Sequence, residues 1–374
     1  MAAPKIYNWA RVTGEVAGVA QFRCKLEDFQ VTENLRFEPS GEGAHHLLFI
    51  EKRNVNTDIV CQKLRRFAQV KPLDIGYAGK KDRFAVAKQW FSVQLPILQE
   101  IDWASFNDDE VTVLESIRHG KKLRVGAVKS NQFVITLRNF EGDKKQLERK
   151  LSEIAQTGFP NYFGEQRFGH NGDNLTRGLD LLNSKKRLKN RNLQGILFSS
   201  VRSAIFNHLL SQRITTGQFG NLLQGDYVQL DGSESGFIVE DLEQELPRYN
   251  ANDIHPCATL VGRGREINAD DAYQFEQQSL SDYQDVIDSL AAKGLSMASR
   301  AIRAFPQNMK LNWESSNTLV LSFELPKGSF ATSFLRELVN LKIEKNSLKL
   351  NIVDNKVKTE NDVDIIINEH ITKQ

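Results

Sequence analysis

Cysteine is scarce in this 374-residue sequence, and its scarcity excludes two kinds of protein. Cys24, Cys61 and Cys257 stand far apart, no C-x-x-C pair occurs, and the odd number argues against a framework of disulfide bonds. Histidine offers no substitute set of metal ligands, because the adjacent His45 and His46 would point to opposite faces of a strand. We therefore expect neither a bound metal nor a disulfide-stabilised secreted domain.

Long apolar runs are absent as well. The longest, such as LLFI at 47–50, are far too short to cross a bilayer. The start, MAAPKIYNWARVTG, has neither the apolar core nor the cleavage pattern of a secretory signal. With 40% hydrophobic and 26% charged residues, the composition is that of a soluble globular protein long enough for two domains. We expect a cytoplasmic protein with no membrane partner.

Positive and negative charges nearly balance over the whole chain, but they are unevenly distributed along it. The net charge is +2, whereas residues 1–213 sum to +11 and residues 214–374 sum to −9. The stretches KKLR at 121–124 and KKRLKNR at 185–191 concentrate the positive charge. Either these stretches are ordinary solvated surface, or the protein binds a polyanion such as nucleic acid.

Hydrophobic periodicity predicts mixed strands and helices in the first 158 residues. A helix is expected at 58–69, capped by Asn56 or Thr57, and another at 143–156, stopped by Gly158. The expected strands cover residues 20–37, 45–53, 89–95, 108–117 and 132–140. Because the strands are largely sequential, this order favours an α+β domain on an antiparallel or mixed sheet.

The amino-acid composition changes where the second half of the chain begins. Residues 158–174 are dense in glycine, aromatic and amide residues, which is typical of a structured loop, and we interpret them as the entrance to another domain. Further along we expect helices at 197–213 and 271–293, a hairpin of 309–313 with 318–326, and a helix after Gly328.

The stretch GYAGKKDRFAV at 76–86 places one acid among several cations, in a connection between two expected strands. Lys80, Lys81 and Arg83 surround Asp82, and nearby cations favour the ionised form of a carboxylate. Connections of this kind commonly display active groups. The plain alternative is an exposed turn with an incidental ion pair, since surface ion pairs are common and weak.

Five motifs follow one another along the chain. They are EDFQVTENLRFEPSGEGAHH at 27–46, GYAGKKD at 76–82, LRVGAVKSNQF at 123–133, PNYFGEQRFG at 160–169 and LPKGSFATSFLREL at 325–338. With these motifs in matching order, the chain resembles the tRNA pseudouridine synthase D family from about residue 12 to about residue 342. The tail matches no motif of that family.

The resemblance implies a fold and a division into domains. The fold is α+β: a pseudouridine synthase catalytic domain with a mixed, largely antiparallel sheet, into which a family-specific α/β domain is inserted. We expect the catalytic domain at 1–158 and 304–342, the inserted domain at 159–303 and a C-terminal extension at 343–374.

The resemblance also implies an activity, the isomerisation of a uridine in the D arm of transfer RNA, at position 13, to pseudouridine. No metal or organic cofactor is expected, the partner is transfer RNA, and we expect a monomer. Asp82 occupies the nucleophile position, and an ionised carboxylate suits that role. Phe29, Phe133 and Phe330 match positions that contact or stack on a flipped-out base, and Asn131 offers it a donor and an acceptor.

Several of these assignments have plain structural alternatives. A strand phenylalanine is usually a core residue, and an isolated asparagine such as Asn131 is more often a turn residue than a ligand. Pseudouridine synthases pair the nucleophile with a basic residue, for which Arg23 is our candidate, with Lys80, Lys81 and Arg83 also nearby in sequence.

Two other segments keep open interpretations. Glu165 and Arg167 could form an internal pair, or Arg167 could contact RNA phosphate. The basic run at 185–191 could clamp the RNA backbone or be a solvated helix end.

Two rival functions stay open beside the synthase. One is an RNA-binding or RNA-folding factor that has kept the fold without the chemistry, against which the intact Asp82 and Asn131 argue. The other is a metal-dependent nuclease or deaminase, against which the missing His/Cys ligand pattern argues.

Overall fold

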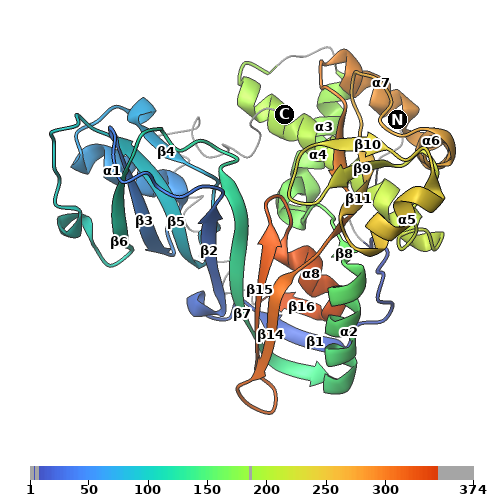
Figure 1. Cartoon of the computed structure of the whole chain (residues 1–374), viewed down its shortest axis with the longest axis horizontal. Coiled ribbons are helices and arrows are strands. Elements are labelled where there is room, and N and C mark those ends of the chain that lie inside the picture. Colours follow the sequence, from blue (N-terminus) through green and yellow to red (C-terminus); the bar gives the residue numbers. More distant parts are fainter. Residues whose placement is uncertain (1–3, 5–7, 185–187, 344–374) are drawn as a thin grey trace.

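The computed structural model describes residue 4 and residues 8–184 and 188–343. Figure 1 shows two groups of elements: a large sheet on the left and below, and a smaller sheet wrapped by helices at the upper right. Residues 185–187 of the basic run and 344–374 of the expected C-terminal extension lie outside the described residues.

The large sheet takes its described strands from both ends of the chain. They are β1 (Gly18–Phe22), β2 (Phe29–Leu35), β3 (His45–Arg53), β4 (Ile75–Tyr77), β5 (Val86–Gln94), β6 (Val111–His119), β7 (Val128–Gly142), β14 (Gln307–Trp313), β15 (Leu319–Pro326) and β16 (Asn340–Ile343). The order is β14-β15-β7-β2-β5-β3-β6, with β4 beside β5 and with β1 between β7 and β16. Only β2–β5 and β1–β16 are parallel among these pairs, so the expected α+β fold on a mixed, largely antiparallel sheet is confirmed.

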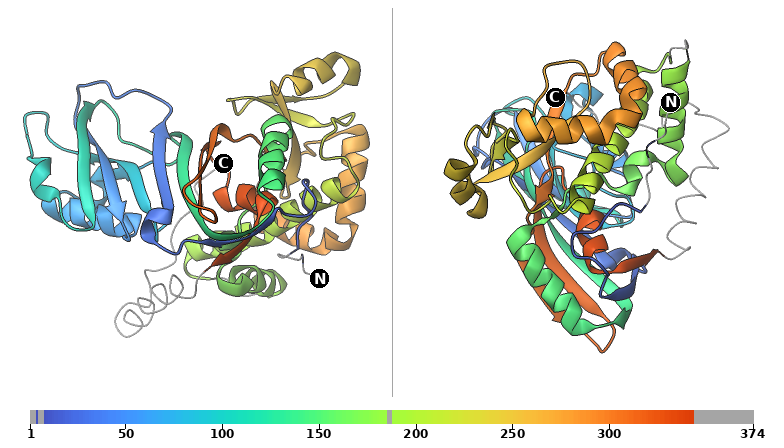
Figure 2. Two further views of the ribbon diagram at one scale, coloured as in Figure 1. Left: turned by 90° about the horizontal axis from the view of Figure 1, so that it is seen from below. Right: turned by 90° about the vertical axis from the view of Figure 1, so that its right-hand side faces the viewer.

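The long strand β7 organises this sheet. Its first part pairs with β2 on one side and β15 on the other, and its last part pairs with β1. In the view from below, β7 curves around α2 (Lys144–Thr157) and α8 (Ala331–Leu338) (Figure 2). Apolar side chains of both helices, such as Leu147, Ile154 and Phe334, are fully buried against the sheet. The concave side of the large sheet is therefore a core.

Helix α1 (Thr57–Phe67) covers the other end of the large sheet. Val60 and Leu64 are fully buried there, and they pack with Leu48 and Ile50 of β3. Phe67, the last residue of α1, is instead 37% exposed.

The smaller sheet has the order β10-β9-β11-β12. Its strands are β9 (Tyr227–Leu230), β10 (Gly236–Ile238), β11 (Ile254–Leu260) and β12 (Ala298–Ala301). The helices around it are α3 (Asp173–Asn183), α4 (Arg191–Thr215), α5 (Leu242–Asn250), α6 (Asp270–Leu280) and α7 (Gln284–Ala292). The central helix α4 is capped by the Asn190 side chain and begins earlier than the expected residue 197.

The chain enters and leaves the smaller group of elements at one place. Strand β8 (Phe159–Pro160) pairs antiparallel with β13 (Arg303–Ala304), so the outgoing and returning segments lie side by side. Gly158, at φ +76°, makes the turn out of α2, and the Asn161 side chain donates to the Ala301 carbonyl.

Two expected elements were wrong because each is broken in the middle. The strand expected at 20–37 is divided into β1 and β2 by Arg23, at φ +59°, and by a short 3-10 helix at Leu26–Asp28. The Asp28 carboxylate holds this break, because it accepts hydrogen bonds from the Lys25 backbone at 2.8 Å and from Arg138 at 2.7 Å. The helix expected at 271–293 is divided into α6 and α7 by the 3-10 helix Ser281–Tyr283.

Candidate active site

The Asp82 loop connects β4 to β5, two antiparallel neighbours in the large sheet. Gly76 in β4 lies so close to the segment around Leu123 that a Cβ atom at Gly76 would be 2.2 Å from the Leu123 carbonyl oxygen. Gly79 has room by comparison, with its nearest neighbour 3.9 Å from such an atom. The glycines of the GYAG stretch therefore have different roles, and only Gly76 is required by close packing.

Asp82 forms an ion pair with Arg23, the basic residue proposed from the sequence. Arg23 Nη2 lies 2.5 Å from Asp82 Oδ2, and the two side chains are 20% and 35% exposed. The positive φ of Arg23 turns its side chain out of the strand direction, and its guanidinium lies 4.1 Å from the centre of the Phe29 ring. The pair is thus held from one side and open to solvent on the other.

Lys52 anchors the backbone of the Asp82 loop through a hydrogen bond. This residue was not identified from the sequence. Its side chain is fully buried, and Nζ donates to the carbonyl oxygens of Asp82 at 2.7 Å and Val55 at 2.8 Å. Burial lowers the pKa of Lys52 to about 8, against the opposing effect of the Asp82 carboxylate. A signal was available, because Lys52 continues the buried alternation of Leu48 and Ile50 in β3.

The lysines of the turn have partners other than Asp82. Lys80 pairs with Asp58 at 2.8 Å, and Lys81 pairs with the buried carboxylate of Glu33. Both lysines thus have carboxylate partners outside the turn, and these ion pairs bind the loop to α1 and β2.

A buried polar chain fixes the loop backbone as well. The Lys81 N–H donates to Thr57 Oγ1 at 3.1 Å, and that hydroxyl donates to Gln89 Oε1 at 3.1 Å. The Gln89 amide in turn donates to the Gly79 carbonyl. These contacts hold the segment before Asp82 in one conformation, and neither Thr57 nor Gln89 was singled out from the sequence for this role.

The expected base-contacting phenylalanines occupy two different places. Phe29 and Phe133 are 4% and 8% exposed, with ring centres 5.9 Å apart, so they form part of the core next to Arg23. Phe330 stands at the start of α8, partly buried, with its ring centre 6.2 Å from that of Phe163. The contacts thus join Phe29 and Phe133 to the Arg23–Asp82 pair and join Phe330 to the smaller group of elements.

Asn131 lies on β7, two residues before Phe133 and opposite Glu33 of β2. Its Oδ1 atom is buried and has no hydrogen-bond partner within residues 8–184 and 188–343. A buried acceptor without a partner is costly, so it is a natural point for a ligand to donate a hydrogen bond.

The Glu165–Arg167 segment is built into the smaller group of elements. Arg167 Nε donates to Ser203 Oγ at 3.3 Å, and its Nη2 donates to Ser199 Oγ.

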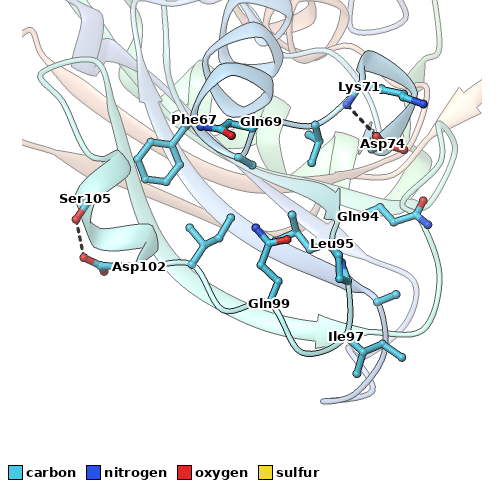
Figure 3. A pocket seen from close by; sticks show the side chains of 15 residues that line it. Phe67, Gln69, Lys71, Asp74, Gln94, Leu95, Ile97, Gln99, Asp102 and Ser105 are labelled. Carbon is cyan, nitrogen blue, oxygen red and sulfur yellow. Dashed lines mark hydrogen bonds between the residues drawn. The ribbon is translucent and has the colours of Figure 1, made fainter.

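A spacious groove on the described surface lies elsewhere. It has a volume of about 1050 Å³ and is lined by the ends of α1 and β5 and by the segments that follow them, including Phe67, Gln69 and Gln94 (Figure 3). No residue of the Arg23–Asp82 pair lines it, so volume alone does not locate the chemistry.

Two features that the described residues lack bear on the class of site. Among them no group of three or more His, Cys, Asp or Glu side chains is arranged to hold a metal ion. None of their helices has both the length and the apolar character needed to span a membrane.

Comparisons with known proteins agree with one another. A family model described as tRNA pseudouridine synthase D (TruD) matches residues 11–185 and 173–338. A relative from Shewanella oneidensis named tRNA pseudouridine synthase D is 42% identical over 329 residues, which cover 87% of this chain and 88% of that protein. One of the same name from Proteus mirabilis is 39% identical over 330 residues, covering 88% and 94%.

A solved structure extends the comparison to the fold. It comes from Methanosarcina mazei and is described as a candidate tRNA pseudouridine synthase D (TruD). The two chains share 22% identity and a TM-score of 0.67, over 91% of this chain and 99% of the other. At this identity the likeness shows a common fold.

Proposed function

Because the chain belongs to the tRNA pseudouridine synthase D family, we propose that it isomerises a uridine in the D arm of transfer RNA, at position 13, with Asp82 as the nucleophile. Membership makes it a tRNA pseudouridine synthase, an isomerase. The observation that supports Asp82 most strongly is its ion pair with Arg23 beside Phe29, in a loop fixed by buried contacts.

The reaction changes which ring atom of the uracil is bonded to the ribose. The bond between N1 of the uracil and C1′ of the ribose breaks, a bond between C5 and C1′ forms, C5 loses its proton and N1 gains one. An ionised carboxylate can begin this sequence by attacking C1′ or by adding to C6. Arg23 keeps the negative charge of Asp82 compensated, while the exposed third of the carboxylate side chain remains accessible to the substrate.

The other site residues would receive the flipped-out nucleotide. Asn131 Oδ1, buried and without a partner in the described chain, would accept a hydrogen bond from the uracil or ribose. Phe29 and Phe133 form the apolar wall beside Arg23, and Phe330 would approach from the junction with Phe163. Because Phe29 and Phe133 are buried, they act as a wall against one edge of the base.

The remaining expectations are part of the same proposal. The division into a catalytic domain at 1–158 and 304–342, an inserted domain at 159–303 and an extension from 343 fits the adjacent strands β8 and β13. The proposed enzyme is a cytoplasmic monomer that uses no metal and no organic cofactor.

Tritium release tests the proposal. A transfer RNA transcript carrying uridine labelled with tritium at C5 should release tritium with the wild-type protein and not with Asp82→Ala, while both proteins bind the RNA. Asp58→Ala, which removes a nearby carboxylate paired with Lys80, is the matched control and should release tritium.

Three outcomes would contradict parts of the proposal. Equal release from wild type and Asp82→Ala would eliminate the nucleophile. RNA binding with no pseudouridine formed by either protein would favour a non-catalytic RNA-binding factor. Release from a uridine outside the D arm would contradict the target.

A further inference from the structure

Three arginines of the smaller group of elements lie near one another, two of them against the Phe163 ring, and we call them the arginine cluster. Arg167 comes from the turn before α3, Arg202 from α4 and Arg300 from the edge strand β12. Arg300 lies with its guanidinium carbon 4.1 Å from the centre of the Phe163 ring, and that of Arg167 lies 5.5 Å from it. Residues far apart in sequence thus bring three cations together.

Neutral oxygens hold these arginines in place. Arg202 Nη1 donates to the Ser296 carbonyl at 3.0 Å. Arg300 Nη2 donates to the Asn161 carbonyl at 3.0 Å and to the Gly328 carbonyl at 2.9 Å. Within the described ranges, no carboxylate lies in ion-pair distance of Arg202 or Arg300. The orientation of the Arg202 and Arg300 guanidinium groups is therefore set without neutralising their charge.

The electrostatic consequence is a local excess of positive charge. Burial, followed by the charge of Arg167, lowers the pKa of Arg300 to about 9. Burial, followed by the charge of Arg202, lowers the pKa of Arg167 to about 10. Charges held close together away from water are costly unless an opposite charge joins them. An anion bound here would remove that cost.

The arginine cluster is connected to the proposed active site through Phe330. Gly328 and Phe330 belong to the segment between β15 and α8 of the large sheet. The Gly328 carbonyl accepts from Arg300, and the Phe330 ring lies next to Phe163. A ligand on the cluster would therefore lie where the two groups of elements meet.

We propose that the arginine cluster binds a backbone phosphate of the transfer RNA next to the nucleotide received by Phe330. This inference rests on the proposed function. A guanidinium presents a planar fork that matches two phosphate oxygens, and its charge cannot be lost at neutral pH. Exposed Arg263 lies near Arg202, because Arg263 forms a β-bridge with Ser296, whose carbonyl accepts from Arg202, and it would extend the path of the RNA backbone.

The salt dependence of RNA binding tests the inference. The affinity for a transfer RNA transcript is measured at several salt concentrations for wild type, Arg202→Gln and Arg202→Lys. Arg149→Gln, on the exposed face of α2, is the control. Arg202→Gln should weaken binding roughly tenfold and reduce the slope of log affinity against log salt by about 0.7–0.9, the value of one phosphate contact. Arg202→Lys should keep the slope, and Arg149→Gln should change neither quantity.

Thermal unfolding of each variant separates binding from folding. If Arg202→Gln and Arg202→Lys lose the same affinity with an unchanged slope, the arginine is only structural and the inference is wrong. Inorganic phosphate gives a second readout on the protein without RNA. If it stabilises wild type but not Arg202→Gln, while the RNA slope is the same for both, the cluster is a free-anion site and the RNA assignment is overturned.

The outcome is independent of the chemistry proposed above. Asp82→Ala should keep the wild-type slope, because the cluster is intact in that variant. Absence of tritium release from wild type would refute the proposed function, whereas an active wild type with a slope unaffected by Arg202→Gln would refute this inference alone.

Discussion

Replacing Lys52 by methionine should remove a specific pH dependence of stability. Lys52 is fully buried, and its pKa in the folded protein is lowered to about 8 from the ordinary 10.5. The unfolded chain therefore holds this proton more tightly than the folded protein, so the free energy of unfolding rises as the pH rises from about 8 to 10.5. Between pH 7.5 and 9.5 the increase is about 2 kcal/mol, which Lys52→Met should lack.

The absolute stability of the variant at pH 7.5 is less informative. Methionine removes the cost of burying a charge, but it leaves the carbonyl oxygens of Val55 and Asp82 without their donor. Each loss is on the order of 1–3 kcal/mol and opposes the gain. The diagnostic quantity is the difference between the two pH values, measured by urea unfolding of both proteins.

Activity provides a second readout of the same substitution. Because Lys52 anchors the backbone of Asp82, Lys52→Met should reduce tritium release by about tenfold or more at saturating RNA. Lys88→Met, which removes a partly exposed lysine from the neighbouring strand β5, is the control and should keep both activity and pH dependence. Parallel stability curves for wild type and Lys52→Met would refute the reasoning.

Three further substitutions test the packing of the Asp82 loop and the protonation of a buried carboxyl group. Gly76→Ala should lower the free energy of unfolding by about 2 kcal/mol or more, because the added Cβ would overlap the Leu123 carbonyl. Gly79→Ala should change that free energy by no more than about 0.5 kcal/mol. Similar urea midpoints for the two variants would contradict this expectation. Burial raises the pKa of Glu276 to about 7, against its hydrogen bonds from Thr259, so wild-type stability should fall as the pH rises from about 4.5 to 7. Glu276→Gln should lose that fall and exceed wild type by about 2 kcal/mol at pH 8, and an unchanged pH profile would show that the carboxyl is not buried in its neutral form.

The parts of the fold that depend on local signals were predictable. The strand expected at 45–53 has those bounds, and the helix expected at 143–156 runs from Lys144 to Thr157 with Asp143 as its cap. The break at Arg23 was missed because it depends on Asp28 binding Arg138, which is 110 residues away along the chain. The alternation of apolar and polar residues that predicts a strand contains no information about a partner as distant as Arg138.

The candidate site divides in the same way. The GYAGKKD motif pointed to Asp82, and Arg23 was the candidate for its basic partner; the structure places these two side chains in contact, although their catalytic roles stay predictions. The partners of Lys80 and Lys81 could not be read from the turn, because Asp58 and Glu33 come from α1 and β2. Positions within a loop show which charges are available, and the surrounding fold decides how they pair.

The pairing of β7 has a consequence for synthesis on the ribosome. One edge of the first part of β7 pairs with β15, and β1, which lies beside the last part of β7, pairs with β16. Both partners come near the end of the described chain. β7 ends at Gly142 and β15 begins at Leu319, so about 180 residues must be translated between them. At roughly 5–20 residues per second, the nascent chain carries an incomplete sheet with unpaired apolar edges for about 10–40 seconds. The intervening elements α3 to β12 emerge during that interval and can fold before the sheet that flanks them is closed.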